Sequence, residues 1–300
     1  MRLFLSMILL LTAFAGEAWS QSSARPLPKG MSIVLPADGS VKAEWVAAPL
    51  PEAQVRRSAI AFQKFLIDPK GAVWMASNQK SLANLVTGFS FSLASPVKDL
   101  VFLDDGALFI VNDTALGFIP PVDDGKLSRK DPVLPFQPVL RLPVEKCMIA
   151  SDGKTGIFVY GHEQATQTYA VFELLKGFSG WNKVFVSGEM ITAVCADEGT
   201  LYIACRRKVY RLHLGEKELE LVFVHPLDTV TGLVFKPGTG LFYATNKGIG
   251  VIAQGALEFI KCPSPQIAIK NNVLYVFLPD SLAELRLTGV EHLVQQKKKE

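Results

Sequence analysis

Short apolar runs alternate with tight polar turns along most of the chain. Residues 192–212 show the pattern: an alternating run reaches a turn at residues 197–199, and two further apolar runs follow it. This order predicts short antiparallel strands joined by tight turns. The unit recurs six times, and each time its second strand is centred on an aromatic residue. These residues are Trp74, Phe109, Phe158, Tyr202, Phe242 and Tyr275.

The spacing of these units predicts a ring of blades. Neighbouring aromatic residues are 33 to 49 positions apart, a period typical of solenoids, propellers and other repeat arrays. A third apolar run follows each aromatic one, a fourth follows in most units, and no amphipathic helix separates them. Closure into a ring protects strand edges that a flat array would leave unpaired. The sequence therefore predicts an all-β fold, a six-bladed β-propeller of four-stranded antiparallel blades.

The N-terminal part of the chain supplies a strand outside the six units. Residues 41–47 are strand-like, whereas the sixth unit has only a weak fourth run at residues 290–294. We therefore expect residues 41–47 to pair with the sixth unit and close the ring. If residues 31–35 joined there as well, the first and last parts of the chain would share one blade. The expected propeller domain is residues 21–294.

Two insertions interrupt the repeat. Residues 122–136 separate the third and fourth strands of the second unit, and residues 161–168 separate the second and third strands of the third unit. Long loops on a rigid scaffold often carry binding residues, and a tolerated surface insertion is the alternative for each.

The units resemble the six-bladed propellers of the NHL-repeat and TolB-like kind. The resemblance covers most of the mature chain and consists of strand pattern and turn placement. No WD dipeptide closes the blades, and no YWTD run is present. The resemblance therefore implies the fold and no particular activity.

Residues 1–20 have the features of a secretory signal peptide. Arg2 precedes an apolar run at residues 3–15, and Ala18 and Ser20 stand at the −3 and −1 positions of a cleavage site. A membrane anchor is the rival interpretation, but the run is shorter than the about 20 apolar residues that span a bilayer. We expect a periplasmic or secreted mature protein with no transmembrane span. Residues 295–300, rich in lysine, are expected to form a flexible tail.

The charge of the chain argues against nucleic acid as a partner. Lysine and arginine number 31 against 28 acidic residues, so the formal net charge is only +3, and part of that excess lies in the lysine tail. Nucleic-acid binding requires a basic face that neutralises phosphates. We therefore expect a protein, a peptide or a saccharide as the partner.

Four cysteines leave two interpretations open. Cys147, Cys195 and Cys205 lie within apolar strands, and Cys262 ends another. A tight turn places Cys195 opposite Tyr202 in its hairpin, not opposite Cys205. This favours buried thiols that behave as small apolar groups, and two disulfides are the alternative in an exported protein. No CxxC spacing supports a zinc or thioredoxin-type site.

Candidate binding residues lie at one end of the predicted channel. In a propeller, the loops between second and third strands meet the blade-to-blade connections at one mouth, where ligands tend to bind. Here these loops carry amides and charges of both signs, which suit a small polar ligand or a peptide. The alternative for each residue is a loop position kept for its backbone preference. The predicted ligand-binding residues are Asn78, Asn112, Asp113, His162, Glu163, Arg206, Arg207, Asn246, Lys247 and Asp280.

Four of these residues introduce an enzymatic alternative. Gluconolactonase-like six-bladed enzymes hold a divalent cation at the mouth with Glu, Asn and Asp, and the fold analogy implies a comparable set here. Oxygen ligands of this kind suit calcium, and the sequence otherwise indicates no cofactor. The glutamate expected at the start of the first blade of that family has no clear match. The implied ligands are Asp113, Glu163, Asn246 and Asp280.

The other catalytic motifs are incomplete. Residues 152–155 resemble the end of a phosphate loop, but Met148 stands where that loop requires glycine, and the four histidines form no metal-binding pair. We therefore expect a binding or scaffold module that meets a protein, peptide or saccharide at the channel mouth, rather than an enzyme. The alternatives are a metal-dependent hydrolase or lyase at the same mouth, and a structural subunit of an envelope complex. An exposed apolar patch away from the mouth would favour the last.

Overall fold

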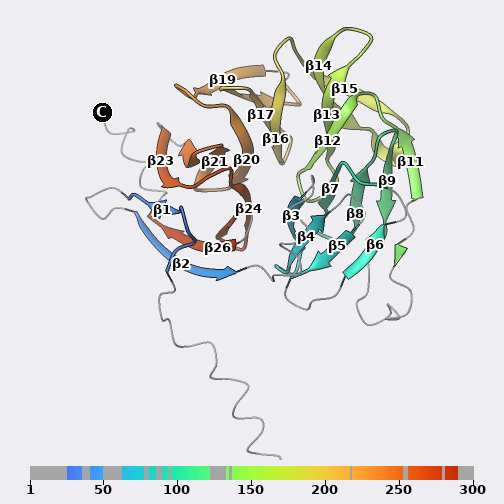
Figure 1. Ribbon diagram of the computed structural model, residues 1–300. Coiled ribbons are helices and arrows are strands. Elements are labelled where there is room, and N and C mark those ends of the chain that lie inside the picture. The colour runs from blue at the N-terminus through green and yellow to red at the C-terminus, as the bar shows by residue number, and fades with distance from the viewer. Residues whose placement is uncertain are drawn as a thin grey trace, which may run out of the picture.

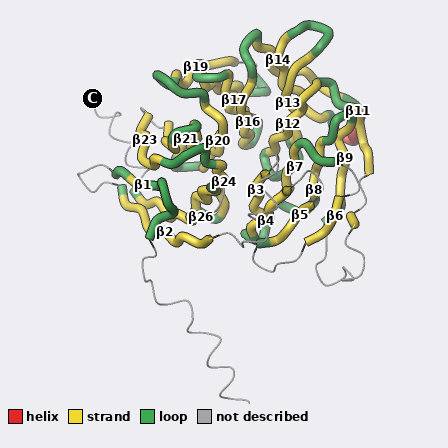
Figure 2. The backbone as a smooth tube through the Cα atoms, in the orientation of Figure 1, coloured by secondary structure: helices red, strands yellow, loops and turns green. Residues whose placement is uncertain are grey.

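Strands make up most of the described chain (Figure 2). The single helical element among the described residues is a 3₁₀ turn, η1 (Lys176–Phe178). In the part of the chain that the structure describes, no helix has the length and apolar character needed to cross a membrane. The computed structural model describes residues 26–35, 41–49, 63–77, 81–85, 90–93, 96–121, 133–134, 137–216, 218–252, 256–278 and 281–289.

Six sheets stand around a common axis as blades (Figure 1). The inner strands contact one another in turn, and the last contacts the first, so the ring is closed. The predicted all-β, six-bladed propeller of four-stranded antiparallel blades is confirmed. From the inside outwards, blade 1 holds β3 (Gln63–Ile67), β4 (Val73–Ser77), β5 (Ser81–Asn84) and β6 (Ser90–Leu93); blade 2 holds β7 (Asp99–Phe102), β8 (Leu108–Val111), β9 (Ala115–Ile119) and β11 (Gln137–Arg141); blade 3 holds β12 (Glu145–Ser151), β13 (Ile157–Glu163), β14 (Thr168–Leu174) and β15 (Trp181–Ser187). Blade 4 holds β16 (Ile191–Asp197), β17 (Thr200–Cys205), β18 (Lys208–His213) and β19 (Glu218–Val224); blade 5 holds β20 (Val230–Lys236), β21 (Gly240–Thr245), β22 (Gly248–Ile252) and β23 (Ala256–Lys261); blade 6 holds β24 (Gln266–Lys270), β25 (Val273–Phe277), β26 (Ser281–Thr288) and β2 (Lys42–Pro49).

The N-terminal strand β2 closes the ring as predicted. It pairs antiparallel with β26 along its whole length, from Lys42 opposite Thr288 to Pro49 opposite Ser281, and Figure 1 shows the blue strand beside the red one. The half-buried Trp45 packs against the apolar core that blades 5 and 6 share. The weak run at residues 290–294 lies outside the described residues, and β2 takes the place of the fourth strand in blade 6.

Residues 31–35 join blade 5 rather than blade 6, the blade considered from the sequence. Strand β1 (Ser32–Ile33) pairs with β23 of blade 5, and the N–H of Val34 donates to the carbonyl oxygen of Phe259 at 2.8 Å. Met31 is buried, and Ile33 and Leu35 pack on the same core. Because these alternate apolar side chains cover the outer edge of β23, residues 31–35 do not join blade 6.

Both predicted insertions contain strand. From the first, β10 (Val133–Leu134) pairs parallel with β6 and gives blade 1 a fifth strand. The second is mostly hairpin rather than loop, because pairing of β13 with β14 continues out to Glu163 opposite Thr168. Gly161 permits this extension, since a Cβ there would lie 2.4 Å from the carbonyl oxygen of Glu145 on the adjacent strand.

The repeated aromatic residues form the contacts between blades. Five of the six are buried, and the half-buried Tyr202 stacks on Phe235 of blade 5 at 5.0 Å between ring centroids. At the closure of the ring, Phe65 of blade 1 stacks on Phe277 of blade 6 at 4.4 Å. Such pairs add to the stabilisation that burial of their surface provides. The aromatic residues therefore recur because each one packs between neighbouring blades.

All four cysteines are free thiols. Cys195 lies opposite Tyr202, as predicted from the tight turn of its hairpin. Cys147, Cys205 and Cys262 are buried, and Cys195 is half-buried, which agrees with their prediction as small apolar residues.

We expect these thiols to be unreactive in the folded protein. Burial raises the pKa of Cys262 to about 12 and raises the pKa of Cys147, Cys195 and Cys205, so little thiolate is present at pH 8. The folded protein holds these protons more tightly than the unfolded chain does. Stability from this source is therefore complete below the ordinary thiol pKa of about 8.5 and falls as the pH rises above it.

A chromogenic thiol reagent checks this prediction at pH 8. None of the four thiols should react before unfolding, and all four should react in denaturant. A second check is the urea midpoint, which should decrease between pH 8 and pH 10. Immediate reaction of even one thiol in the folded protein would show that its site opens to solvent.

Candidate functional site

The loops between second and third strands lie on the same face as the blade-to-blade connections. The N–H of Val230, at the start of β20, donates to the carbonyl oxygen of Arg206 at 2.8 Å. The N–H of Ser264, before β24, donates to the carbonyl oxygen of Asn246 at 2.9 Å. We call this the mouth face, because the inner strands start here.

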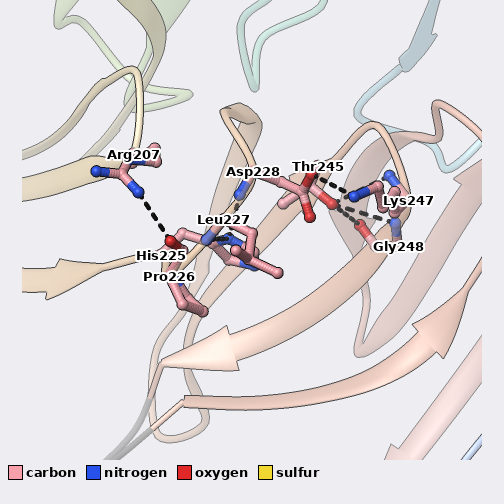
Figure 3. A network of polar contacts seen from close by, with 8 residues as sticks. All are labelled: Arg207, His225, Pro226, Leu227, Asp228, Thr245, Lys247 and Gly248. Atoms are coloured by element: carbon pink, nitrogen blue, oxygen red, sulfur yellow. Dashed lines mark hydrogen bonds and ion pairs between the residues drawn. The ribbon is translucent and has the colours of Figure 1, made fainter.

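Two exposed arginines occupy the loop between β17 and β18. Arg206 has a left-handed φ of 52°, and its N–H donates to the carbonyl oxygen of Met190 at 3.2 Å. Arg207 Nη1 donates to the carbonyl oxygen of Pro226 at 2.8 Å (Figure 3). Within the described residues, neither arginine forms an ion pair with a carboxylate. The loop therefore holds two positive side chains on a fixed backbone.

A buried histidine holds the neighbouring connection between β19 and β20. His225 is 4% exposed, and its own N–H donates to the carbonyl oxygen of Arg207 at 2.7 Å. Its Nδ1 accepts hydrogen bonds from the N–H groups of Asp228 at 2.8 Å and Leu227 at 3.3 Å (Figure 3). Nδ1 accepts both bonds only when it is unprotonated. His225 thus works as an internal cap that fixes this connection.

An ion pair joins this connection to blade 5. Lys247 Nζ lies 2.8 Å from Asp228 Oδ1, and the lysine side chain is 63% exposed while the aspartate is 15% exposed. The buried Thr245 Oγ1 accepts from the N–H groups of Lys247 at 3.1 Å and Gly248 at 3.2 Å (Figure 3). Together with Arg206, Arg207 and the connection fixed by His225, these residues form what we call the mouth network.

The connection between blades 3 and 4 places Glu189 beside the positive side chains of the loop between β17 and β18. Lys208 Nζ donates to Glu189 Oε1 at 2.8 Å. This bond holds the pKa of Glu189 below its ordinary value, and the positive charges of Arg206 and Arg207 lower it further. An acidic group that approaches this side of the mouth is therefore favoured in its ionised form.

The predicted residues of blade 2 have local partners. Asn112 Oδ1 accepts from the N–H groups of Thr114 at 2.9 Å and Ala115 at 2.8 Å, which stabilises the loop between β8 and β9. The carboxylate of Asp113 lies 3.1 Å from Lys98 Nζ and is 73% exposed. Asn112 therefore stabilises the backbone of its loop, which is the alternative to ligand binding given for it above.

The predicted residues of blade 3 lie at the end of the β13–β14 hairpin. His162 packs edge-on against Tyr169, with 5.2 Å between ring centroids. Glu163 accepts from Lys183 Nζ at 2.6 Å and from Thr166 Oγ1 at 2.7 Å. The bond from Lys183, followed by that from Thr166, holds the pKa of Glu163 below its ordinary value.

The two carboxylates of the proposed calcium set that the structure describes each form an ion pair with a lysine. Asp113 is paired with Lys98, and Glu163 with Lys183, so neither carboxylate is uncommitted. Among the described residues, no group of three His, Cys, Asp or Glu side chains lies together. Asn246 is exposed beside Lys247, whereas Asn78 and Asp280 lie outside the described residues.

The sequence reasoning missed a buried aspartate that links three blades near the mouth. Asp99, the first residue of β7, has no exposed surface. Its Oδ1 pairs with Lys64 Nζ of blade 1 and accepts from the N–H of Leu100 at 2.9 Å, and its Oδ2 accepts from the N–H of Ile149 of blade 3 at 2.9 Å. The only signal in the sequence is a charged residue directly before the apolar run at residues 100–103.

Hydrogen bonds to or from side chains also join other pairs of inner strands near the mouth. Thr192 Oγ1 of blade 4 donates to the carbonyl oxygen of Val230 of blade 5 at 2.6 Å. The N–H of Phe65 of blade 1 donates to Gln266 Oε1 of blade 6 at 3.2 Å. Bonds of this kind link neighbouring blades near the mouth.

The comparisons with known proteins identify the fold. No family model matches the chain, and no curated protein matches it by sequence. Solved structures do: virginiamycin B lyase from Staphylococcus aureus shares 12% identity at a TM-score of 0.56, over 82% of this chain and 99% of that one. A gluconolactonase from Xanthomonas campestris shares 13% identity at 0.54, over 80% and 94%. A chain of a nidogen/laminin complex shares 13% identity at 0.50, over 71% and 83%. At these identities the likeness concerns the fold alone, and the chain is a six-bladed β-propeller.

Proposed function

We propose that this protein is an exported binding module whose mouth network holds a carboxylate-bearing partner, either a protein, a peptide or a saccharide. The observation that carries the proposal is the pair of exposed arginines, Arg206 and Arg207, on a loop whose backbone is hydrogen-bonded to the connection behind it. A guanidinium group that is already positioned binds a carboxylate through two parallel hydrogen bonds with little loss of freedom.

Three further features support a binding role at this place. His225 and Thr245 hold the backbones of the two loops beside the arginines, and Arg207 Nη1 is itself bonded to the carbonyl oxygen of Pro226. The chain of a nidogen/laminin complex provides an example of the same fold within a protein assembly. The signal-like residues 1–20 fit a protein that meets its partner outside the cytoplasm.

The test is a binding screen against peptides rich in glutamate and oligosaccharides rich in uronic acid. We expect at least one acidic probe to bind, and the double variant Arg206→Ala/Arg207→Ala to weaken it about tenfold or more. The matched control is Lys154→Ala, which removes an exposed lysine paired with Glu198 in the turns of the opposite face and should leave affinity unchanged. Equal affinities in the two variants, or no binding of any acidic probe, would refute the proposal.

Melting temperatures measured with and without calcium test the enzymatic alternative, a divalent-metal-dependent hydrolase or lyase. Calcium would then raise the melting temperature, and Asp113→Asn and Glu163→Gln would abolish that rise. The ion pairs of Asp113 and Glu163 with their own lysines favour the binding role instead. A melting temperature that does not respond to calcium is the result that the proposal expects.

A further inference from the structure

The chain itself covers the outer edges of two blades with an additional strand. On blade 5, β1 places Ser32 opposite Lys261 and Ile33 opposite Ile260 of β23. Beneath this cover, Phe259 is 3% exposed and Ile260 has no exposed surface. On blade 1, β10 pairs with β6 in the same way but in parallel. An outer strand of this propeller therefore accepts a fifth strand and buries apolar side chains when it does.

Blade 4 has the same kind of edge without a cover. Within the described residues, β19 is the last strand of its sheet. Leu219, Leu221 and Val224 are 48%, 52% and 45% exposed. Their pairing with β18 places all three on the face of the strand that is directed toward blade 3. Exposed apolar side chains in a row along an unpaired edge mark an interaction site.

The composition of β19 also sets it apart from the other uncovered edges. The outer strands of blades 2, 3 and 6 carry Arg141, Lys183 and Lys42, and blade 2 adds Pro138. Proline discourages a further strand from pairing at an edge, and lysine makes such pairing less favourable without preventing it, since β23 carries Lys261 and still accepts β1. The sequence of β19, ELELVFV, has neither, nor any arginine. Its β-bulge is no obstacle, because β23 has the corresponding bulge and still accepts β1.

The charges of β19 determine which partner fits. Glu218 and Glu220 alternate with the exposed leucines, and Glu216 lies two residues before the strand, separated from it by Lys217. Glu220 pairs with Arg211 of β18, whereas Glu218 forms no ion pair among the described residues. Two copies of β19 in antiparallel pairing would bring these glutamates together, which disfavours a dimer through this edge. A strand with basic residues between apolar ones would instead place opposite charges side by side.

We propose that β19 is a docking edge for an extended segment of a partner protein. The segment pairs antiparallel as a fifth strand of blade 4, as β1 does on blade 5, and alternates apolar with basic side chains. This mode of recognition takes its affinity from main-chain hydrogen bonds and its selectivity from the alternate side chains. It is independent of the mouth network, which belongs to the loops of blades 4 and 5.

The probe is a blocked peptide of alternating lysine and valine, titrated against the whole protein by fluorescence anisotropy. Leu219→Lys/Leu221→Lys should weaken binding about tenfold or more, because it removes the apolar stripe and adds like charge. The matched control is Val186→Lys on β15, a side chain 51% exposed, which should bind as the unaltered protein does. Arg206→Ala/Arg207→Ala should also leave binding unchanged, so failure here and failure at the mouth are distinguishable.

Two further readouts test the strand pairing itself. The amide signals of β19 in NMR spectra should shift on binding and exchange more slowly with solvent, and a peptide N-methylated on its pairing side should not bind. Binding that survives the double lysine variant, binding by the N-methylated peptide, absence of binding, or a dimer through β19 would each overturn the proposal.

Discussion

Replacing Asp99 with alanine is expected to lower the free energy of unfolding by about 3–5 kcal/mol, the cost of removing one partner from a buried ion pair. The carboxylate has no exposed surface and joins three neighbouring blades through Lys64, its own strand and the N–H of Ile149. Alanine leaves the N–H of Ile149 without its acceptor and the part-buried ammonium group of Lys64 without its carboxylate. Urea denaturation, followed by circular dichroism, measures the loss.

Two variants separate the ion pair from a general loss of charge. Asp113→Ala removes an aspartate that also pairs with a lysine but is 73% exposed, and it should leave the urea midpoint almost unchanged. The double variant Lys64→Met/Asp99→Leu removes both charges and should be markedly more stable than Asp99→Ala, because no buried charge is left unpaired. An Asp99→Ala protein with the midpoint of Asp113→Ala would contradict the assigned role of Asp99.

The fold was predictable because its signal is local. Each hairpin is encoded by an apolar run, a turn and an aromatic run, and all six aromatic residues identified in the sequence lie in the second strand of a blade. The closing role of β2 followed from the number of predicted strands. One N-terminal strand lay outside the six units, and the sixth unit had only a weak fourth strand. The place of β1 did not follow, because its pairing with β23 depends on the contact of Met31 and Ile33 with a core formed by distant residues.

The candidate site was predictable only in its position. Topology places Arg206, Arg207, Asn246 and Lys247 at one face of the ring. The residues that hold them, above all His225, lie in a connection that looks like any polar loop in the sequence. Asp99 was missed for a related reason: its partners Lys64 and Ile149 lie 35 and 50 residues away in the sequence, and only the packing of neighbouring blades brings them to it.

A chain that starts at residue 50, and so lacks β1 and β2, is expected to lose cooperative unfolding. Strand β2 is the fourth strand of blade 6. Among the described residues, it is the strand that pairs with the outer edge of β26. Without it, β26 becomes an open edge and the apolar core under Trp45 is exposed to water. The loss is comparable with the whole stability of a domain, about 5–15 kcal/mol. A broad, non-cooperative thermal transition is the expected measurement.

A chain that starts at residue 41 is the matched control, because it lacks β1 and the apolar residues around it, as the shorter chain does, but retains β2. It should unfold cooperatively at a modestly lower temperature. A synthetic peptide of residues 41–49, added to the chain that starts at residue 50, should restore a sharp transition, since the register from Lys42 to Pro49 supplies a complete strand. If the chain that starts at residue 50 unfolds as sharply as the control and ignores the peptide, the ring is held closed by contacts between the inner strands rather than by β2.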